Sequence, residues 1–118
     1  MAVTSYKIDT YSVRVYANEE SGEKTVWGTK TIFMYSGGKH VASAFFAKAG
    51  FQAPDADFSA DDGHIYFHAQ GEQYSAVIDL LRNEKPVYIN WAPTSDDVES
   101  DDGEAYFNTG KEPTGEEE

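Results

Sequence analysis

Apolar and polar residues alternate along several short stretches of the chain, which is the pattern of half-buried β-strands. Tyr11, Val13 and Val15 share one parity in the first of these stretches, whereas the second is apolar at both parities, which is typical of a central strand covered on both faces. Eight tyrosines and seven phenylalanines favour strands as well. The predicted strands cover residues 6–17, 24–35, 40–47, 64–69, 86–92 and 104–109.

Short turn sequences separate the first three predicted strands. Residues 18–22 are polar and end in glycine, and residues 36–38 read Ser-Gly-Gly. Both are turn sequences, because glycine adopts positive φ at no steric cost. Two tight reversals in a row predict an antiparallel meander. Residues 48–63, rich in Gly, Pro, Ala and Asp, are predicted to form a long loop.

One stretch has the period of a helix rather than a strand. Tyr74, Val77, Ile78 and Leu81 are spaced i, i+3, i+4 and i+7, which predicts an amphipathic helix over residues 72–84.

A helix of about twelve residues returns the chain by about 18 Å, close to the length of a six-residue strand. We therefore expect the flanking strands, 64–69 and 86–92, to run parallel and to be joined by a right-handed crossover. The predicted fold class is α+β: a mainly antiparallel, mixed β-sheet of about six strands, with the helix between strands four and five.

The distribution of charge adds a boundary to this picture. The chain has 118 residues, enough for one domain, and carries 21 acidic against 9 basic residues. Residues 92–118 alone hold ten acidic residues and one basic residue. Residues 111–118 contain no apolar side chain that could anchor them to a core. We expect one small α+β domain over residues 1–110 and an acidic, disordered tail over 111–118.

Composition excludes several classes of protein. The chain has no cysteine, which rules out disulfide frameworks, thiolate metal sites and cysteine nucleophiles. A net charge of −12 argues against direct binding of nucleic acid or of an anionic membrane, because phosphate contacts need clustered Lys and Arg. The first residues form no signal peptide, and no stretch approaches the ~20 apolar residues of a membrane span. These features predict a cytoplasmic location.

Two segments of the chain resemble each other. Each has Ala-Pro, an acidic loop, Asp-Asp-Gly and then a strand with Tyr-Phe, which is Tyr66-Phe67 in the first and Tyr106-Phe107 in the second. The resemblance indicates either a duplication or two independent solutions to one turn problem, since Asp-Asp-Gly is ordinary turn chemistry.

The two acidic loops also present alternating oxygen ligands, a pattern used to bind hard cations. Neither loop has the glycine and the glutamate that an EF-hand loop requires, so a solvated acidic loop is the competing interpretation. The weak calcium candidates are Asp57, Asp61, Asp97 and Asp101.

No catalytic motif has workable spacing. His64 and His68 have the spacing of a helical zinc pair, but on a strand they lie ~13 Å apart, too far to share a metal. Residues 36–40 lack the first glycine and the Ser or Thr of a phosphate-binding loop. The sequence therefore predicts no catalytic residues and no cofactor.

The strongest functional indication is a face of the predicted sheet. If the apolar residues of the last three strands point toward the helix, alternation places one tyrosine of each strand on the opposite face, among polar side chains. Such aromatic and polar mixtures suit ligand pockets and interfaces, although solvent or the meander would satisfy the same pattern. The residues of this candidate face are His64, Tyr66, His68, Tyr88, Asn90, Tyr106 and Asn108.

The sequence thus favours a non-catalytic binding or protein-interaction module whose partner is a protein or a small ligand. One alternative is a small enzyme using histidine and carboxylate acid–base chemistry on the same face, with His64 or His68 as the base. A calcium-binding acidic-loop protein and an acidic mimic of nucleic acid are further alternatives.

Overall fold

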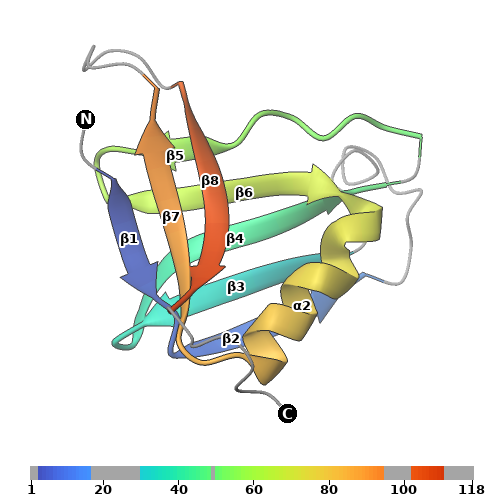
Figure 1. The fold of residues 1–118 in the computed structure, drawn as a ribbon. Coiled ribbons are helices and arrows are strands. Elements are labelled where there is room, and N and C mark those ends of the chain that lie inside the picture. The colour runs from blue at the N-terminus through green and yellow to red at the C-terminus, as the bar shows by residue number, and fades with distance from the viewer. Residues whose placement is uncertain (1–2, 17–29, 49, 95–101, 111–118) are drawn as a thin grey trace.

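Eight strands in two sheets make up most of the chain that the computed structural model describes, residues 3–16, 30–48, 50–94 and 102–110. The larger sheet has the order β2-β3-β4-β6-β5 and the smaller sheet β1-β7-β8 (Figure 1). Neighbouring strands pair antiparallel apart from β4 and β6, which pair parallel. The predicted α+β class with mixed, mainly antiparallel strand pairing is confirmed, although the strands form two sheets rather than one sheet of about six. The strands are β1 (Thr4–Lys7), β2 (Thr10–Val15), β3 (Lys30–Ser36), β4 (Lys39–Ala47), β5 (Asp57–Ser59), β6 (His64–Gln70), β7 (Val87–Pro93) and β8 (Gly103–Thr109).

The predicted helix is present between β6 and β7. A 3-10 turn, Gly71–Gln73, leads into α2, Tyr74–Asn83. Val77 and Ile78 are the buried residues of α2, so the apolar stripe read from the sequence faces the core. The helix ends where Glu84 takes an extended conformation, two residues before Pro86.

One core joins the two sheets and the helix. The smaller sheet and α2 lie side by side over the same face of the larger sheet (Figure 1). Burial of each large aliphatic side chain contributes about 1.5–3 kcal/mol to stability. The core residues are Ile32, Met34, Val41, Ala42, Ala44, Phe46, Ile65, Ala69, Val77, Ile78, Ile89 and Trp91.

The prediction of one long first strand was wrong. The segment forms two strands in different sheets: β1 pairs with β7, and β2 pairs with β3. The chain changes sheet at Ile8 and Asp9, whose N–H groups donate to the carbonyls of Val87 and Tyr35, each at 2.9 Å. Val15, which shares its parity with Tyr11 and Val13, is 65% exposed. Alternation within a strand shows that it has a face, but not which sheet that face belongs to.

The prediction that the strands flanking the helix are parallel neighbours was also wrong. β6 and β7 belong to different sheets, and the parallel partner of β6 is β4, in register from Ala42 opposite Ile65 to Ala47 opposite Gln70. The crossover to a parallel strand therefore runs through residues 48–63. That segment, predicted to be a loop throughout, contains the short strand β5. A helix of this length can carry the chain from the larger sheet to the smaller sheet as well as back to a neighbouring strand of the same sheet.

The tight turn between β3 and β4 is confirmed at Gly37 and Gly38, which have φ of 59° and 84°. Other predictions fall outside the described residues: the turn at 18–22, residues 24–29 of the second strand, and the tail 111–118.

Among the helices that the structure describes, none has the length and apolar character needed to cross a membrane.

Candidate functional site

The seven residues of the predicted face lie in two groups. His64, Tyr66 and His68 are on the outer face of the larger sheet, on β6. The other four are on the outer face of the smaller sheet. Since the two sheets pack through their inner faces, the groups lie on opposite sides of the molecule. The residues on the smaller sheet are Tyr88, Asn90, Tyr106 and Asn108.

Two of the four side chains on the smaller sheet, Asn90 and Asn108, hydrogen-bond to each other. Asn90 is only 4% exposed, and its Nδ2 donates to the Tyr106 carbonyl at 3.3 Å and to Asn108 Oδ1 at 3.0 Å. Tyr106 is 41% exposed. This group thus pairs two amide side chains beside the exposed ring of Tyr106.

The outer face of the larger sheet, in contrast, gathers rings from three adjacent strands. His40 and His64 are in edge contact, with centroids 4.6 Å apart, and Tyr66 lies 4.6 Å from His64. Phe45 stacks on His68 with centroids 5.2 Å apart. All three histidines of the chain are on this face. We call it the outer aromatic face, and its residues are Phe33, Tyr35, His40, Phe45, His64, Tyr66 and His68.

A serine hydroxyl holds the histidine end of this face together. Ser43 Oγ lies 3.2 Å from His40 Nε2 and 3.0 Å from His64 Nε2. Burial, and next the charge of His40, lowers the pKa of His64, and Asp62 opposes that shift. Ser43 is only 3% exposed, so its hydroxyl is inaccessible to a substrate carbonyl. The arrangement fixes the imidazoles and does not form a serine nucleophile.

The other end of the outer aromatic face is hollowed. Phe45, Asp57, Tyr66 and His68 line a pocket of about 370 Å³, which we call the β6 hollow. Its origin lies in the sheet register, because β5 begins at Asp57, opposite Tyr66, and the β5–β6 ladder does not extend to His68. On the other side of β6, Phe45 of β4 is in register with His68.

The electrostatics of the β6 hollow are simple. Burial lowers the pKa of His68, and the nearby carboxylate of Asp57 opposes that shift. His68 is therefore neutral at pH 7, and Asp57 is the charged side chain among the four that line the hollow. The lining surface is otherwise mostly apolar.

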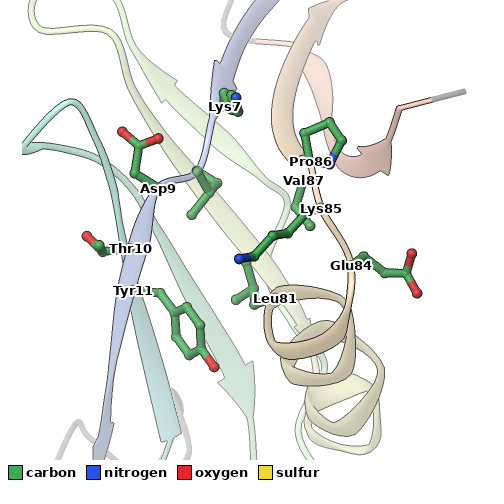
Figure 2. Close-up of a pocket in the computed structure, with 10 residues that line it drawn as sticks. Lys7, Asp9, Thr10, Tyr11, Leu81, Glu84, Lys85, Pro86 and Val87 are labelled. Carbon is green, nitrogen blue, oxygen red and sulfur yellow. The ribbon is translucent and has the colours of Figure 1, made fainter.

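A second, larger pocket of about 660 Å³ lies where the β1–β2 connection meets the end of α2 (Figure 2). Figure 2 shows Leu81 of α2 and Lys85 on one side of it and Tyr11 of β2 on the other. Its charged groups have both signs. The Asp9 carboxylate accepts a hydrogen bond from the N–H of Gly37 at 2.5 Å. The lining residues are Lys7, Ile8, Asp9, Thr10, Tyr11, Leu81, Glu84, Lys85, Pro86 and Val87.

The calcium candidates are dispersed. Asp57 lines the β6 hollow, where its Oδ1 accepts the N–H of Phe58 at 2.8 Å. Asp61 is exposed in the turn before β6, and Asp97 and Asp101 lie outside the described residues. Over the described ranges, no three or more His, Cys, Asp or Glu residues are grouped so that they could hold a metal ion.

Sequence reasoning missed the contribution of β4 to the outer aromatic face. His40, Ser43 and Phe45 share a strand that is apolar at both parities, so the pattern did not separate an outer from an inner face. The larger pocket was missed because its lining depends on the division of the first strand into β1 and β2. Comparisons with family models, with curated proteins and with solved structures found no match.

Proposed function

We propose that this protein is a non-catalytic binding module that captures a small ligand or a protein side chain on the outer aromatic face, at the β6 hollow. The observation that carries the proposal is the hollow itself: rings from two strands surround a mostly apolar depression beside a carboxylate. Pockets that combine apolar walls with few polar groups are the usual form of ligand sites. The expected cytoplasmic location, without contact to membrane or nucleic acid, is part of this proposal.

Rigid rings are suited to this role. Phe45 and Tyr66 each offer a large contact area with only two rotatable side-chain bonds, so little conformational entropy is lost when a ligand is bound. The β-ladder between β4 and β6 fixes the spacing between them, because Ser43 is in register with Tyr66 and Phe45 with His68. A binding surface built on paired strands is already organised before the ligand arrives.

A fragment titration followed by NMR on the full ¹⁵N-labelled chain tests the proposal. We expect ligands to shift the signals of Phe45, Asp57 and Tyr66 and to leave the opposite outer face, including Tyr106, unchanged. Replacement of Phe45 with Ala should abolish those shifts, whereas the matched change Tyr106→Ala should leave them unchanged. Fragments that shift only residues of the larger pocket, such as Leu81, would contradict the proposal.

The enzyme alternative has one observation in its favour. Asp57 lies close enough to His68 to oppose the fall in its pKa, and a histidine beside a carboxylate is a common acid–base pair. If this pair is catalytic, the rate with a substrate would depend on the titration of His68. Loss of that rate and its pH profile in His68→Gln, with unchanged fragment binding, would favour the enzyme over the binding module.

A further inference from the structure

We propose that the β6 hollow binds an organic cation, namely an alkylated ammonium group held against the rings of Phe45, Tyr66 and His68 and beside the carboxylate of Asp57. This inference rests on the proposed function, because it assigns a ligand class to the same site.

The rings form the walls of an aromatic cage. Phe45 and His68 stack on each other at an interplanar angle of 19°, with centroids 5.2 Å apart, so together they form one wall. Tyr66 projects from the same face of β6 two residues before His68 and forms the other wall. Side chains two residues apart on a strand lie ~7 Å from each other, which leaves a ligand room to touch both. The face of an aromatic ring is negative and its edge is positive, so a cation is attracted by each ring whose face it lies over within about 6 Å of the centroid.

The charge of the site favours a cation. Asp57 supplies a carboxylate, and the lining contains neither lysine nor arginine. A neutral apolar ligand would bury part of this carboxylate without compensation, which is costly. An anion would be repelled by Asp57 and by a chain whose net charge is −12. A cation offsets the charge of the carboxylate and is also attracted by the ring faces.

The scarcity of polar groups favours an alkylated ammonium over a bare one. A primary ammonium has three donors and is strongly hydrated, so it would have to exchange water for partners in a mostly apolar hollow. Alkyl groups remove those donors and add apolar surface that packs on the rings. Quaternary ammonium groups are the ligands that aromatic cages recognise best.

The larger pocket provides an internal comparison. It is lined by Lys7 and Lys85 as well as by Asp9 and Glu84, so an organic cation would meet like charges there. Binding that is confined to the β6 hollow therefore distinguishes a cage from general attraction of cations to an acidic chain.

The test compares choline with 3,3-dimethylbutan-1-ol, a neutral molecule of nearly the same shape. Both are titrated into the full ¹⁵N-labelled chain, and the shifts of Phe45, Asp57, Tyr66 and His68 are followed. We expect choline to bind at the hollow at least about tenfold more tightly than the alcohol, which is about 1.4 kcal/mol. Equal affinities would overturn the cation while leaving the hollow as a ligand site. If neither compound binds at the hollow while other fragments do, the cation is likewise overturned and the hollow remains a ligand site. If no compound or fragment binds at the hollow, the proposed function is overturned as well.

Two substitutions sharpen this test. Asp57→Asn keeps the oxygen that accepts the N–H of Phe58 but removes the charge. The affinity for choline should therefore fall about tenfold, whereas the affinity for 3,3-dimethylbutan-1-ol should not change. Asp55→Asn removes the same charge from an exposed position outside the lining and is the matched control. An equal loss in both variants would show that the field of the whole chain, not the cage, binds the cation. If Asp57→Asn loses its dispersed NMR spectrum, Phe45→Leu tests the cage by removing one ring.

Discussion

At the scale of single residues, the contact of Ser43 with two imidazoles defines how the outer aromatic face is built. A neutral imidazole has one donor and one acceptor nitrogen, so the hydroxyl can donate to one ring and accept from the other. The Nε2 atoms of His40 and His64 both point at this oxygen, at 3.2 and 3.0 Å. A proton added to both rings would leave Ser43 with two donors and no acceptor for its own hydrogen.

The lowered pKa values of His64 and His68 predict a loss of stability in mild acid. Burial, followed by the charge of His40, lowers the pKa of His64 below the usual 6.5, and burial lowers that of His68. The unfolded chain therefore takes up these protons at a higher pH than the folded chain does. The free energy of unfolding should be constant above about pH 6.5 and should fall as the pH drops below that value.

Urea unfolding at pH 7.5 and at pH 5.5 checks this prediction. The double variant His64→Gln, His68→Gln should show a smaller difference in midpoint between the two pH values than the unchanged chain does, since glutamine does not titrate. The same difference in both proteins would mean that other groups govern the acid sensitivity.

Residue-scale detail also separates the two Asp-Asp-Gly sequences. Gly63 has φ of +74°, a conformation that suits glycine. Both glycines are also needed for space, because a Cβ would lie 2.5 Å from the Tyr6 hydroxyl oxygen at Gly63 and 2.4 Å from Cζ2 of Trp91 at Gly103. The rings of Phe67 and Phe107 then meet in the core with centroids 4.9 Å apart. The two glycines thus share the need for space and differ in backbone conformation.

At the scale of elements, α2 contributes to the core through a narrow stripe. Ile78 is buried among the core residues, whereas Leu81, one turn later, is only partly buried. Replacement of Ile78 with Ala should lower the free energy of unfolding by about 2–5 kcal/mol, because it leaves a cavity. Chemical denaturation measures this loss. Ser75→Ala, at an exposed position of the same helix, should change it by less than about 0.5 kcal/mol, and a similar loss in both variants would contradict this role of α2.

The positions of the helix and strands along the chain were much more predictable than the pairing of the strands with one another. The period of α2 and the alternation in β6 and β8 are local properties, so their bounds were predicted to within two residues. The division between β1 and β2, the short strand β5 and the β4–β6 pairing depend on which distant strand completes the hydrogen bonds. Alternation carries no information on that choice.

The candidate site shows the same limit. Tyr66 and His68 were identified by parity, and Asp57 was identified only as a calcium candidate. Phe45 was missed, since both faces of β4 are apolar and its pairing with β6 was not foreseen. The β6 hollow exists because three strands meet there with unequal lengths, which no single segment of sequence encodes.

At the scale of the whole molecule, the two sheets share one core and should unfold together. Trp91 of the smaller sheet is buried and stacks on Phe58 of the larger sheet, with centroids 5.7 Å apart. With Trp27 replaced by Phe, Trp91 is the only tryptophan of the chain, so its fluorescence reports the contact between the sheets. Its unfolding transition should coincide with that of the far-ultraviolet circular dichroism. Fluorescence that changes at lower denaturant would show that the sheets separate first.

The order of the elements along the chain has a consequence for synthesis on the ribosome. The larger sheet is complete in sequence at Gln70, but its apolar inner face is covered by α2, β7 and β8, which follow over the next ~40 residues. At a synthesis rate of about 5–20 residues per second, the inner face of the larger sheet stays uncovered for roughly 2–8 seconds. Ile32, Met34 and Ile65 are fully buried in the finished protein, yet they are exposed to water during this interval. The nascent chain is therefore a better substrate for a chaperone than the finished molecule. Synonymous changes that slow translation after the codon for Gln70 should lower the yield of folded protein.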